Sequence, residues 1–285
     1  MLLRPEPGPS TLKITRWGGR RLVALRGGSD LPRDATVGES WEFSTLPGHE
    51  SRVAGRPLSA VLGGPLPFLA KLLDTALPLS VQVHPDDTAD APGKEEAWIV
   101  LAADPDACVW AGVRPGATRK QFSDAVAHGA ACMDLLQRHP VAPGTVLLLP
   151  ARTVHAIGGG ILLAEIQQPS DCTLRLYDHG SDRPIQPDAA LAVADLTRAP
   201  EVWRPQIDAP RALRGRHVTL EILGPGRHDH HAAAPTLLVA ACGRVRVDVG
   251  DEVAELEPGD LRLVRDRLQI DVPAGAWCVV GSVSP

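Results

Sequence analysis

The sequence of 285 residues has few cysteines and few aromatic residues. Its five cysteines are scattered, odd in number and never at C-x-x-C spacing. This usage argues against a disulfide framework and a thiolate metal site, and it is typical of a reducing compartment. Aromatic residues make up only 4% of the chain, so leucine, valine and alanine must form most of the core.

Long apolar runs and an excess of basic charge are also missing. No run of about 18 apolar residues is present, and residues 1–20 mix prolines and charges without the apolar core of a signal peptide. The net charge of -5 and the pI near 6.1 argue against nucleic acid as a partner. We therefore expect a soluble, cytoplasmic protein with neither a membrane nor a nucleic acid as its partner.

Glycine and proline are plentiful, at 27 residues each, which favours short strands joined by turns over a helical protein. Residues 1–10 are predicted to be a loose tail. Alternating apolar runs predict strands over 66–74, 79–84, 145–149 and 161–167, and a strand pair, 98–101 with 107–111, across the turn at 104–106. Helices are predicted at 58–62 and 188–196, and in an excursion over 118–140 for which Thr118 is the expected N-cap.

The strand Leu79-Ser80-Val81-Gln82-Val83-His84-Pro85 is the most informative segment. Side chains two apart share one face of a strand, so Gln82 and His84 point the same way while Val81 and Val83 pack. Glu96 follows 12 residues after His84, and His155 comes much later. Two histidines, a carboxylate and a neutral oxygen donor form a plausible zinc set with room for water or substrate.

These residues lie in short blocks that follow one another along the chain. The blocks are Trp17-Gly18-Gly19, Gly38-Glu39-Ser40-Trp41-Glu42, Lys71-Leu72-Leu73-Asp74, Gln82-Val83-His84-Pro85-Asp86-Asp87, Gly93-Lys94-x-Glu96-x-Trp98, His155-Ala156-Ile157-Gly158, Glu165-Ile166-Gln167-Gln168-Pro169-Ser170-Asp171 and Arg175-Leu176-Tyr177-Asp178. Together they resemble the short bacterial form of type I mannose-6-phosphate isomerase, a zinc-dependent member of the cupin superfamily.

The resemblance implies a mainly β fold with two cupin-like jelly-roll barrels and a small helical excursion. We expect a metal-binding cupin domain over 1–185 with its helical insertion around 118–140, a helical junction over 186–210, and a degenerate cupin-like β domain over 211–285. The block around His155 resembles the second cupin motif, although Arg152 stands where glycine is usual.

The resemblance also implies a site and a reaction. One Zn²⁺ per chain is expected on His84, Glu96 and His155 together with Gln82, whose amide could instead bond a substrate hydroxyl or a zinc-bound water. The implied reaction interconverts mannose 6-phosphate and fructose 6-phosphate through a cis-enediol, which needs a proton carrier and a donor for the developing oxyanion. The residues assigned to catalysis are Arg175, Glu165 and Lys94, and those assigned to the phosphate end of the pocket are Lys71 and Ser80.

Several assignments have alternatives. The proton carrier is either Glu165 or Lys94, and Glu165 could be a structural ion-pair partner of Arg175. Glu95 is expected to be a solvated charge. The sequence Arg227-His228-Asp229-His230-His231 is a rival metal site, but it lacks the glutamate and the final histidine of a cupin set, so we expect a solvated cluster there.

Departures from the family pattern leave the exact sugar open. They are Arg16 for proline, Ile99 and Leu174 for tyrosines, and Gln186 for histidine. The alternatives are an isomerase for another sugar phosphate and a non-catalytic cupin that binds sugar or metal.

Overall fold

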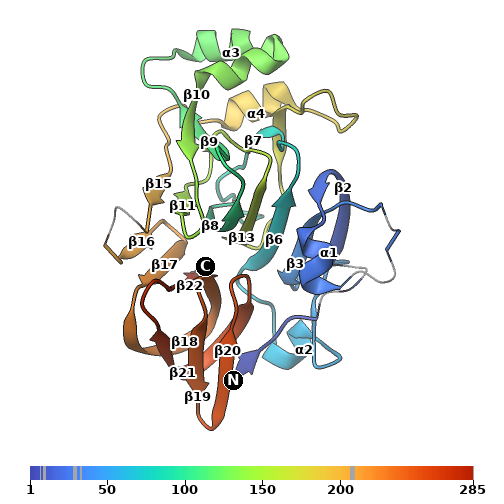
Figure 1. Ribbon diagram of the computed structural model, residues 1–285. Coiled ribbons are helices and arrows are strands. Elements are labelled where there is room, and N and C mark those ends of the chain that lie inside the picture. Colours follow the sequence, from blue (N-terminus) through green and yellow to red (C-terminus); the bar gives the residue numbers. More distant parts are fainter. Residues whose placement is uncertain (7, 9–10, 28–30, 33, 206–208, 285) are drawn as a thin grey trace.

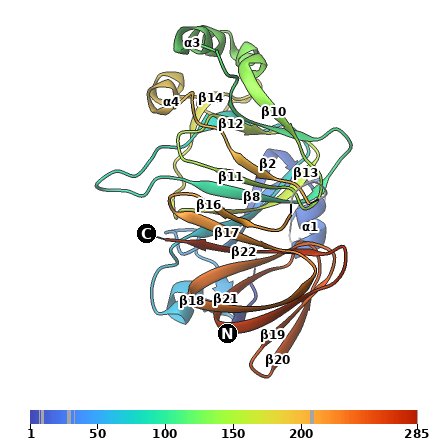
Figure 2. The same cartoon turned by 90° about the vertical axis from the view of Figure 1, so that its left-hand side faces the viewer.

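The computed structural model describes residues 1–285 apart from 7, 9–10, 28–30, 33, 206–208 and 285. It consists mainly of strands, as the composition predicts, and the strands are stacked in layers (Figure 1). From top to bottom in Figure 2 these layers are the helices α3 (Arg119–Ala127) and α4 (Pro187–Val193), an upper sheet, a central sheet and a C-terminal sheet. The mainly β fold class is therefore confirmed.

The central sheet has inner strands that are buried on both faces, among them Leu69–Thr75, Val146–Leu149 and Ile161–Gln167. Its order from edge to edge is β15 (Glu201–Trp203), β11 (Val146–Leu149), β8 (Glu96–Ala103), β13 (Ile161–Gln167), β6 (Leu69–Thr75), β2 (Leu12–Gly19) and β3 (Val37–Phe43), and β3 also pairs with β6. Along β8, Trp98 and Val100 belong to the core shared with the upper sheet, whereas Ala97 and Ile99 belong to the core shared with the C-terminal sheet. This alternation follows from the two-residue period of a strand.

The upper sheet faces the central sheet. Its order is β10 (Leu136–Pro140), β9 (Cys108–Val113), β12 (His155–Ile157), β7 (Val81–Val83) and β14 (Leu174–Tyr177). Its outer face packs on α3 and α4. Val81 and Val83 of β7 and Phe122 of α3 belong to this core, and none of the three has exposed surface. The predicted inward packing of Val81 and Val83 is confirmed, so Gln82 is left on the face that looks toward the central sheet.

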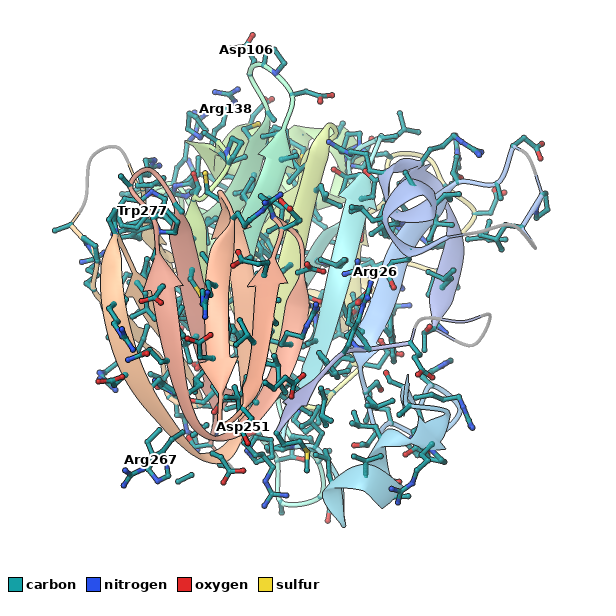
Figure 3. All side chains as sticks on the ribbon, turned by 60° about the horizontal axis from the view of Figure 1, so that its bottom comes forward. Arg26, Asp106, Arg138, Asp251, Arg267 and Trp277 are labelled. Atoms are coloured by element: carbon teal, nitrogen blue, oxygen red, sulfur yellow. The ribbon has the colours of Figure 1, made fainter. Side chains whose placement is uncertain are left out.

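The C-terminal sheet covers the other side of the central sheet. Its order is β16 (Ala212–Arg214), β17 (Val218–Leu223), β22 (Trp277–Val283), β18 (Gly226–Cys242), β21 (Leu261–Val272), β19 (Val245–Val249) and β20 (Glu252–Leu256). On β18, Leu237 and Val239 pack toward the central sheet, whereas Leu238 packs within the C-terminal sheet. Trp277 of β22 is labelled on the left of this sheet in Figure 3, and Arg26, from the N-terminal part of the chain, is labelled to the right of the sheet.

The small elements largely match the predictions. The helix α2 (Leu58–Leu62) is found where predicted, and Gly63 ends it in the left-handed conformation. Thr118 caps α3 with a complete capping box, in which its hydroxyl accepts from the backbone of Gln121 and the Gln121 side chain accepts from Thr118. Helix α1 (Arg21–Arg26) and the hairpin of β4 (Arg52–Val53) and β5 (Arg56–Pro57) complete this part of the chain. The predicted excursion is helical only to the 3₁₀ helix Gly129–Leu135, because 136–140 is strand β10.

The predicted strand pair 98–101 with 107–111 is wrong. Strand β8 pairs with β11 and β13 in the central sheet, whereas β9 pairs with β10 and β12 in the upper sheet. The turn at Asp106, labelled in Figure 3, therefore leads from one sheet to the other. A short polar turn indicates a change of direction but not the sheet that receives the next strand.

The predicted loose tail is also wrong in part. Strand β1 (Leu2–Leu3) pairs with Val264 and Leu263 of β21, and Glu6 forms a bridge with Arg52. Residues 7, 9 and 10 of that prediction lie outside the described residues.

The predicted division into 1–185, 186–210 and 211–285 stays a prediction. Within the junction, α4 is found near the predicted helix, and β15 joins the edge of the central sheet. Residues 206–208 of the junction lie outside the described residues. Among the helices that the structure describes, none has the length and apolar character needed to cross a membrane.

Candidate metal centre and active site

Three predicted ligands meet between the upper and central sheets. His84 follows β7, His155 begins β12 and Glu96 begins β8, and all three are at most 2% exposed. His84 Nε2 lies 3.4 Å from Glu96 Oε2, and His155 Nε2 lies 3.3 Å from Glu96 Oε1. The ligand atoms of the three residues all lie within 4.8 Å of one another, and no other such group of three occurs among the residues that the structure describes.

Backbone carbonyls orient both imidazole rings. His84 Nδ1 lies 2.9 Å from the carbonyl oxygen of Cys172, and His155 Nδ1 lies 2.9 Å from that of Thr153. Because a carbonyl oxygen only accepts, each Nδ1 carries the hydrogen and each Nε2 lone pair faces Glu96. His155 Nε2 and Glu96 Oε1 are buried without a hydrogen-bond partner. Unpartnered acceptors converging on one point are suited to a cation.

The electrostatics of the site favour the protonation states that metal ligands need. Burial, reinforced by the charge of Lys94, lowers the pKa of His84 to about 3, and burial also lowers the pKa of His155. Burial opposes ionisation of Glu96, but Lys94 and the two histidines outweigh it and hold the pKa of Glu96 well below its usual value. Neutral imidazoles and an ionised carboxylate are therefore present near neutral pH.

Lys94 lies against the same donor atoms. Its Nζ donates to Glu96 Oε2 at 2.6 Å and lies 2.9 Å from His84 Nε2, and its side chain is 5% exposed. The ammonium group therefore places a positive charge beside the three ligands. This contact also brings Lys94, assigned to catalysis, to the predicted metal site.

The upper sheet aligns Gln82 with two other predicted site residues. On β7, Gln82 is the register partner of His155 on β12 and of Arg175 on β14. Directly opposed residues of antiparallel strands share a face, so the three side chains form a row. Arg175 Nε is buried without a partner, and burial together with Arg183 lowers the pKa of Arg175. Ser80 is buried, and its hydroxyl lies 3.4 Å from Gln82 Oε1.

The central sheet supplies the opposite wall of the site. Glu165 on β13 is the register partner of Lys71 on β6 and of Trp98 on β8. Its Oε2 lies 3.2 Å from Lys71 Nζ, and its Oε1 accepts from Trp98 Nε1 at 3.1 Å. Burial raises the pKa of Glu165. The alternative in which Glu165 is the ion-pair partner of Arg175 is therefore wrong, because Lys71 has that position.

Two further side chains at this wall were not singled out from the sequence. Glu39 Oε2 lies 3.8 Å from Lys71 Nζ, and the Trp41 ring centroid lies 5.0 Å from the same nitrogen. Burial opposes the charge of Lys71, but Glu165 and Glu39 outweigh it and raise the pKa of Lys71. Glu39 and Trp41 belong to the block Gly38-Glu39-Ser40-Trp41-Glu42, and membership of this block was the sequence signal that could have identified them as site residues.

Arg152 occupies a backbone conformation that explains why glycine is usual there. Its φ is 69°, in the left-handed region that residues with a Cβ seldom adopt. Its backbone N–H donates to the His84 carbonyl oxygen at 2.8 Å, and its Nε donates to the carbonyl of Val193 at 2.9 Å. The loop before His155 therefore contacts the backbone of His84, another predicted ligand, although the arginine side chain points away toward α4.

The rival histidine cluster has partners of a different kind. On β18, His228 Nε2 lies 2.8 Å from the carbonyl oxygen of Gly224, and His230 Nδ1 lies 3.5 Å from Glu221 Oε2. His231 is exposed. The cluster lies on the C-terminal sheet, away from the row of Gln82.

We therefore predict that replacing His228 and His230 together with alanine leaves turnover nearly unchanged, because neither residue belongs to the site between the sheets. Steady-state kinetics of the double variant beside the parent would measure this. A loss beyond about tenfold, which corresponds to about 1.4 kcal/mol in the barrier, would contradict the prediction.

A separate hollow of about 690 Å³ lies at the other end of β7, where Leu77 and Pro78 enter the strand. Exposed Leu77 and Ile14 and the ion pair of Asp178 with Arg183 border it. The lining of this hollow includes none of the predicted ligands, which lie at the His84 end of β7.

Comparisons with known proteins identify relatives of the chain. A family model for the catalytic domain of type I phosphomannose isomerase matches residues 9–108. The mannose-6-phosphate isomerase of Streptococcus mutans is 31% identical over 278 residues, which cover 86% of this chain and 87% of that protein. The mannose-6-phosphate isomerase ManA of Bacillus subtilis is 33% identical over 213 residues, 65% of this chain and 66% of that protein.

Solved structures support the fold. The mannose 6-phosphate isomerase of Bacillus subtilis has a TM-score of 0.75 with 22% identity and covers 98% of this chain and 99% of that one. A mannose 6-phosphate isomerase bound with zinc and yttrium has a TM-score of 0.68 with 15% identity over the full length of both chains. At these identities the likeness shows that this chain shares the fold of those proteins, and the site geometry must support the chemistry.

Proposed function

Because the chain belongs to the type I mannose-6-phosphate isomerase family of aldose-ketose isomerases, we propose that it interconverts mannose 6-phosphate and fructose 6-phosphate through a cis-enediol with one zinc ion per chain. The observation that supports this most directly is the buried group of His84, Glu96 and His155. Its members present unpartnered acceptor atoms, and Lys94 lies beside them.

The donor set suits zinc. Two imidazole nitrogens and a carboxylate are common zinc ligands, and three protein ligands leave a position for substrate or water. Gln82 shares the face of His155 and is the remaining oxygen donor of the proposed set. Zinc bound there would supply positive charge to stabilise the negative charge that develops on the substrate oxygens.

Metal binding has a consequence for Lys94. The neutral ring of His84 has one lone pair at Nε2, so it cannot bind a metal and accept from Lys94 at once. To hold a metal, His84 would therefore have to give up its contact with the Lys94 ammonium group. The released group is then available to a substrate bound beside the ligands.

Two residues can carry the proton between C1 and C2. Lys94 contacts the ligand atoms themselves, whereas Glu165 is tied to Lys71 and Trp98 in the central sheet. The raised pKa of Glu165 makes this carboxyl easier to protonate, which suits a group that both takes up and returns a proton. We favour Lys94 because of its position and keep Glu165 as the alternative.

The remaining assigned residues have positions that suit an anionic substrate. Arg175 has a buried, unpartnered Nε in the row of Gln82, so its planar guanidinium can donate to an oxyanion or a phosphate. We propose Lys71 and Ser80 for the phosphate end of the pocket. We also propose a cytoplasmic location, because the five cysteines of the chain are all free.

A coupled assay for fructose 6-phosphate formed from mannose 6-phosphate tests the proposal. We expect turnover by the purified chain, loss of activity after treatment with a chelator, and recovery when zinc is added back. Turnover of a different sugar phosphate would change the substrate but keep the chemistry. Absence of isomerisation by zinc-loaded protein with any aldose or ketose phosphate would contradict the proposal and favour a binding cupin.

A further inference from the structure

A turn of the C-terminal sheet reaches the segment that joins two of the proposed ligands. We call residues 215–218, from Gly215 to Val218, the 215–218 turn. Glu95 stands between Lys94 and Glu96 and is only 4% exposed. Its Oε1 accepts from the backbone N–H groups of His217 at 2.9 Å and Val218 at 2.7 Å, and its Oε2 accepts from that of Arg216 at 3.1 Å. The expectation that Glu95 is a solvated charge is therefore wrong.

A second carboxylate joins the same turn to the residues after His84. Asp87 Oδ2 lies 2.8 Å from His217 Nε2, and Asp87 Oδ1 accepts from the Gly93 backbone at 2.7 Å. His217 Nδ1 in turn lies 3.0 Å from the carbonyl oxygen of Ser284. The His217 ring is therefore held between the C-terminal end of the chain and the loop that follows a ligand.

Gln168 connects the two carboxylates. Its Oε1 accepts from the Glu95 backbone at 2.9 Å, and its Nε2 donates to Asp87 Oδ1 at 2.9 Å. The Lys94 backbone also donates to the carbonyl of Pro85 at 3.0 Å. These bonds make the segment from His84 to Glu96 one connected unit, and the 215–218 turn is attached to it at both Glu95 and Asp87.

The contact needs a close approach of the turn. A Cβ at Gly215 would collide with the Glu95 carboxylate, so the glycine lets the turn come near enough for its N–H groups to bond that side chain. A carboxylate that accepts three backbone N–H groups is held more firmly than one in a surface ion pair. The bonds to the turn consequently hold Glu95, and with it the backbone immediately before β8, in place.

Alternation along the strand transmits this restraint to the site. Successive side chains of this extended segment, which leads into β8 at Glu96, point to opposite faces. Lys94 and Glu96 therefore meet at the proposed metal centre, whereas Glu95 bonds the turn of the C-terminal sheet. Fixing Glu95 therefore fixes the backbone from which both site residues project. Small displacements of reacting groups lower rates strongly, by about a hundredfold for 1 Å in some enzymes.

We propose that the 215–218 turn is a positioning element of the metal centre, acting through Glu95 on Lys94 and Glu96. The inference rests on the proposed function and deepens it. It gives the C-terminal sheet a role in catalysis although that sheet contributes none of the proposed ligands.

The test uses Glu95→Gln in the full chain, which keeps the size of the side chain and removes its charge. We expect zinc affinity, measured by competition with a chromophoric chelator, to fall about tenfold or more, because changes to residues that orient metal ligands commonly have effects of that size. We also expect kcat to fall at least about tenfold with KM within about twofold. Both quantities are to be taken per folded molecule, with folding checked by circular dichroism and thermal melting.

Two matched controls separate positioning from loss of stability. Arg216→Ala removes side-chain contacts with Asp86 and Asp87 but leaves the backbone N–H that bonds Glu95, so zinc affinity and kcat should stay at the parent values. Val239→Ala removes packing between the C-terminal and central sheets, so it should lower the melting temperature without changing zinc affinity or kcat.

If Glu95→Gln does not fold, Gly215→Ala tests the same contact from the side of the turn. The added methyl group would press on the Glu95 carboxylate, so this variant should also lower zinc affinity and kcat. A folded Glu95→Gln or Gly215→Ala variant with lower stability but parental zinc affinity and kcat would overturn the inference. An inactive parent that binds no zinc would instead overturn the proposed function, and this inference with it.

Discussion

Replacing His84 and His155 together with alanine should remove nearly all of the bound metal. The expected content falls from about one zinc per chain to below about a tenth, because Glu96 with only the neutral amide of Gln82 is too weak a site. Turnover should fall with the metal. Elemental analysis of the purified variant, together with the coupled assay, would measure both losses.

The matched control for this variant is the His228→Ala/His230→Ala protein, which also lacks two histidines and should keep its metal. The structure makes the contrast sharp, since His84 and His155 meet at Glu96 whereas His228 bonds a backbone carbonyl on the C-terminal sheet. Full retention of metal by the His84/His155 variant would refute the ligand assignment and move the site to the histidine cluster.

Arg175→Lys should lower turnover by about two orders of magnitude, which corresponds to about 2.7 kcal/mol in the barrier. Arginine presents a planar fork that can grip two oxygens, and the lysine ammonium group cannot reproduce it. The coupled assay on the zinc-loaded variant, at saturating mannose 6-phosphate, would measure the effect.

The structure also supplies the control for Arg175. Its backbone N–H donates to Gln186 Oε1 at 3.2 Å, and this bond does not depend on the side chain, so folding should be preserved. Metal content and melting temperature should therefore stay close to the parent. If the variant unfolds or loses zinc while its rate per folded, metal-loaded molecule is normal, Arg175 has a structural role and its catalytic assignment is wrong.

The meeting of the three proposed ligands could be predicted from the sequence because their signals are local. Alternation places Gln82 and His84 on one face, and short blocks contain Glu96 and His155, so the meeting of the three ligands needs only the family fold. The partner of Glu165 could not be predicted in this way. Both Arg175 and Lys71 are nearby cations in matched blocks, and the register of β13 with β6 selects Lys71.

Glu95 illustrates what the pattern leaves open. Alternation correctly separates it from Glu96, but an acidic residue on the far face of a strand is usually solvated. Here Glu95, immediately before β8, is covered by a segment more than 100 residues later in the chain, whose N–H groups bond the carboxylate. No residue pattern within 93–98 indicates that Glu95 contacts this later segment. Likewise, no residue pattern within the 104–106 turn indicates that the chain passes to another sheet there.

The pairing of β1 with β21 has a consequence for how the molecule assembles. Strand β19 pairs with β21 only over Gln269–Asp271, and β1 pairs farther along, at Leu263 and Val264. Leu2 and Leu3 are far from their partners Val264 and Leu263 in the sequence, so this pairing closes a very long loop and forms late. Until β1 arrives, part of β21 exposes unpaired backbone groups to other nascent chains. Pairing with β1 thus covers a stretch of β21 whose unpaired backbone groups could otherwise bond a strand of another chain.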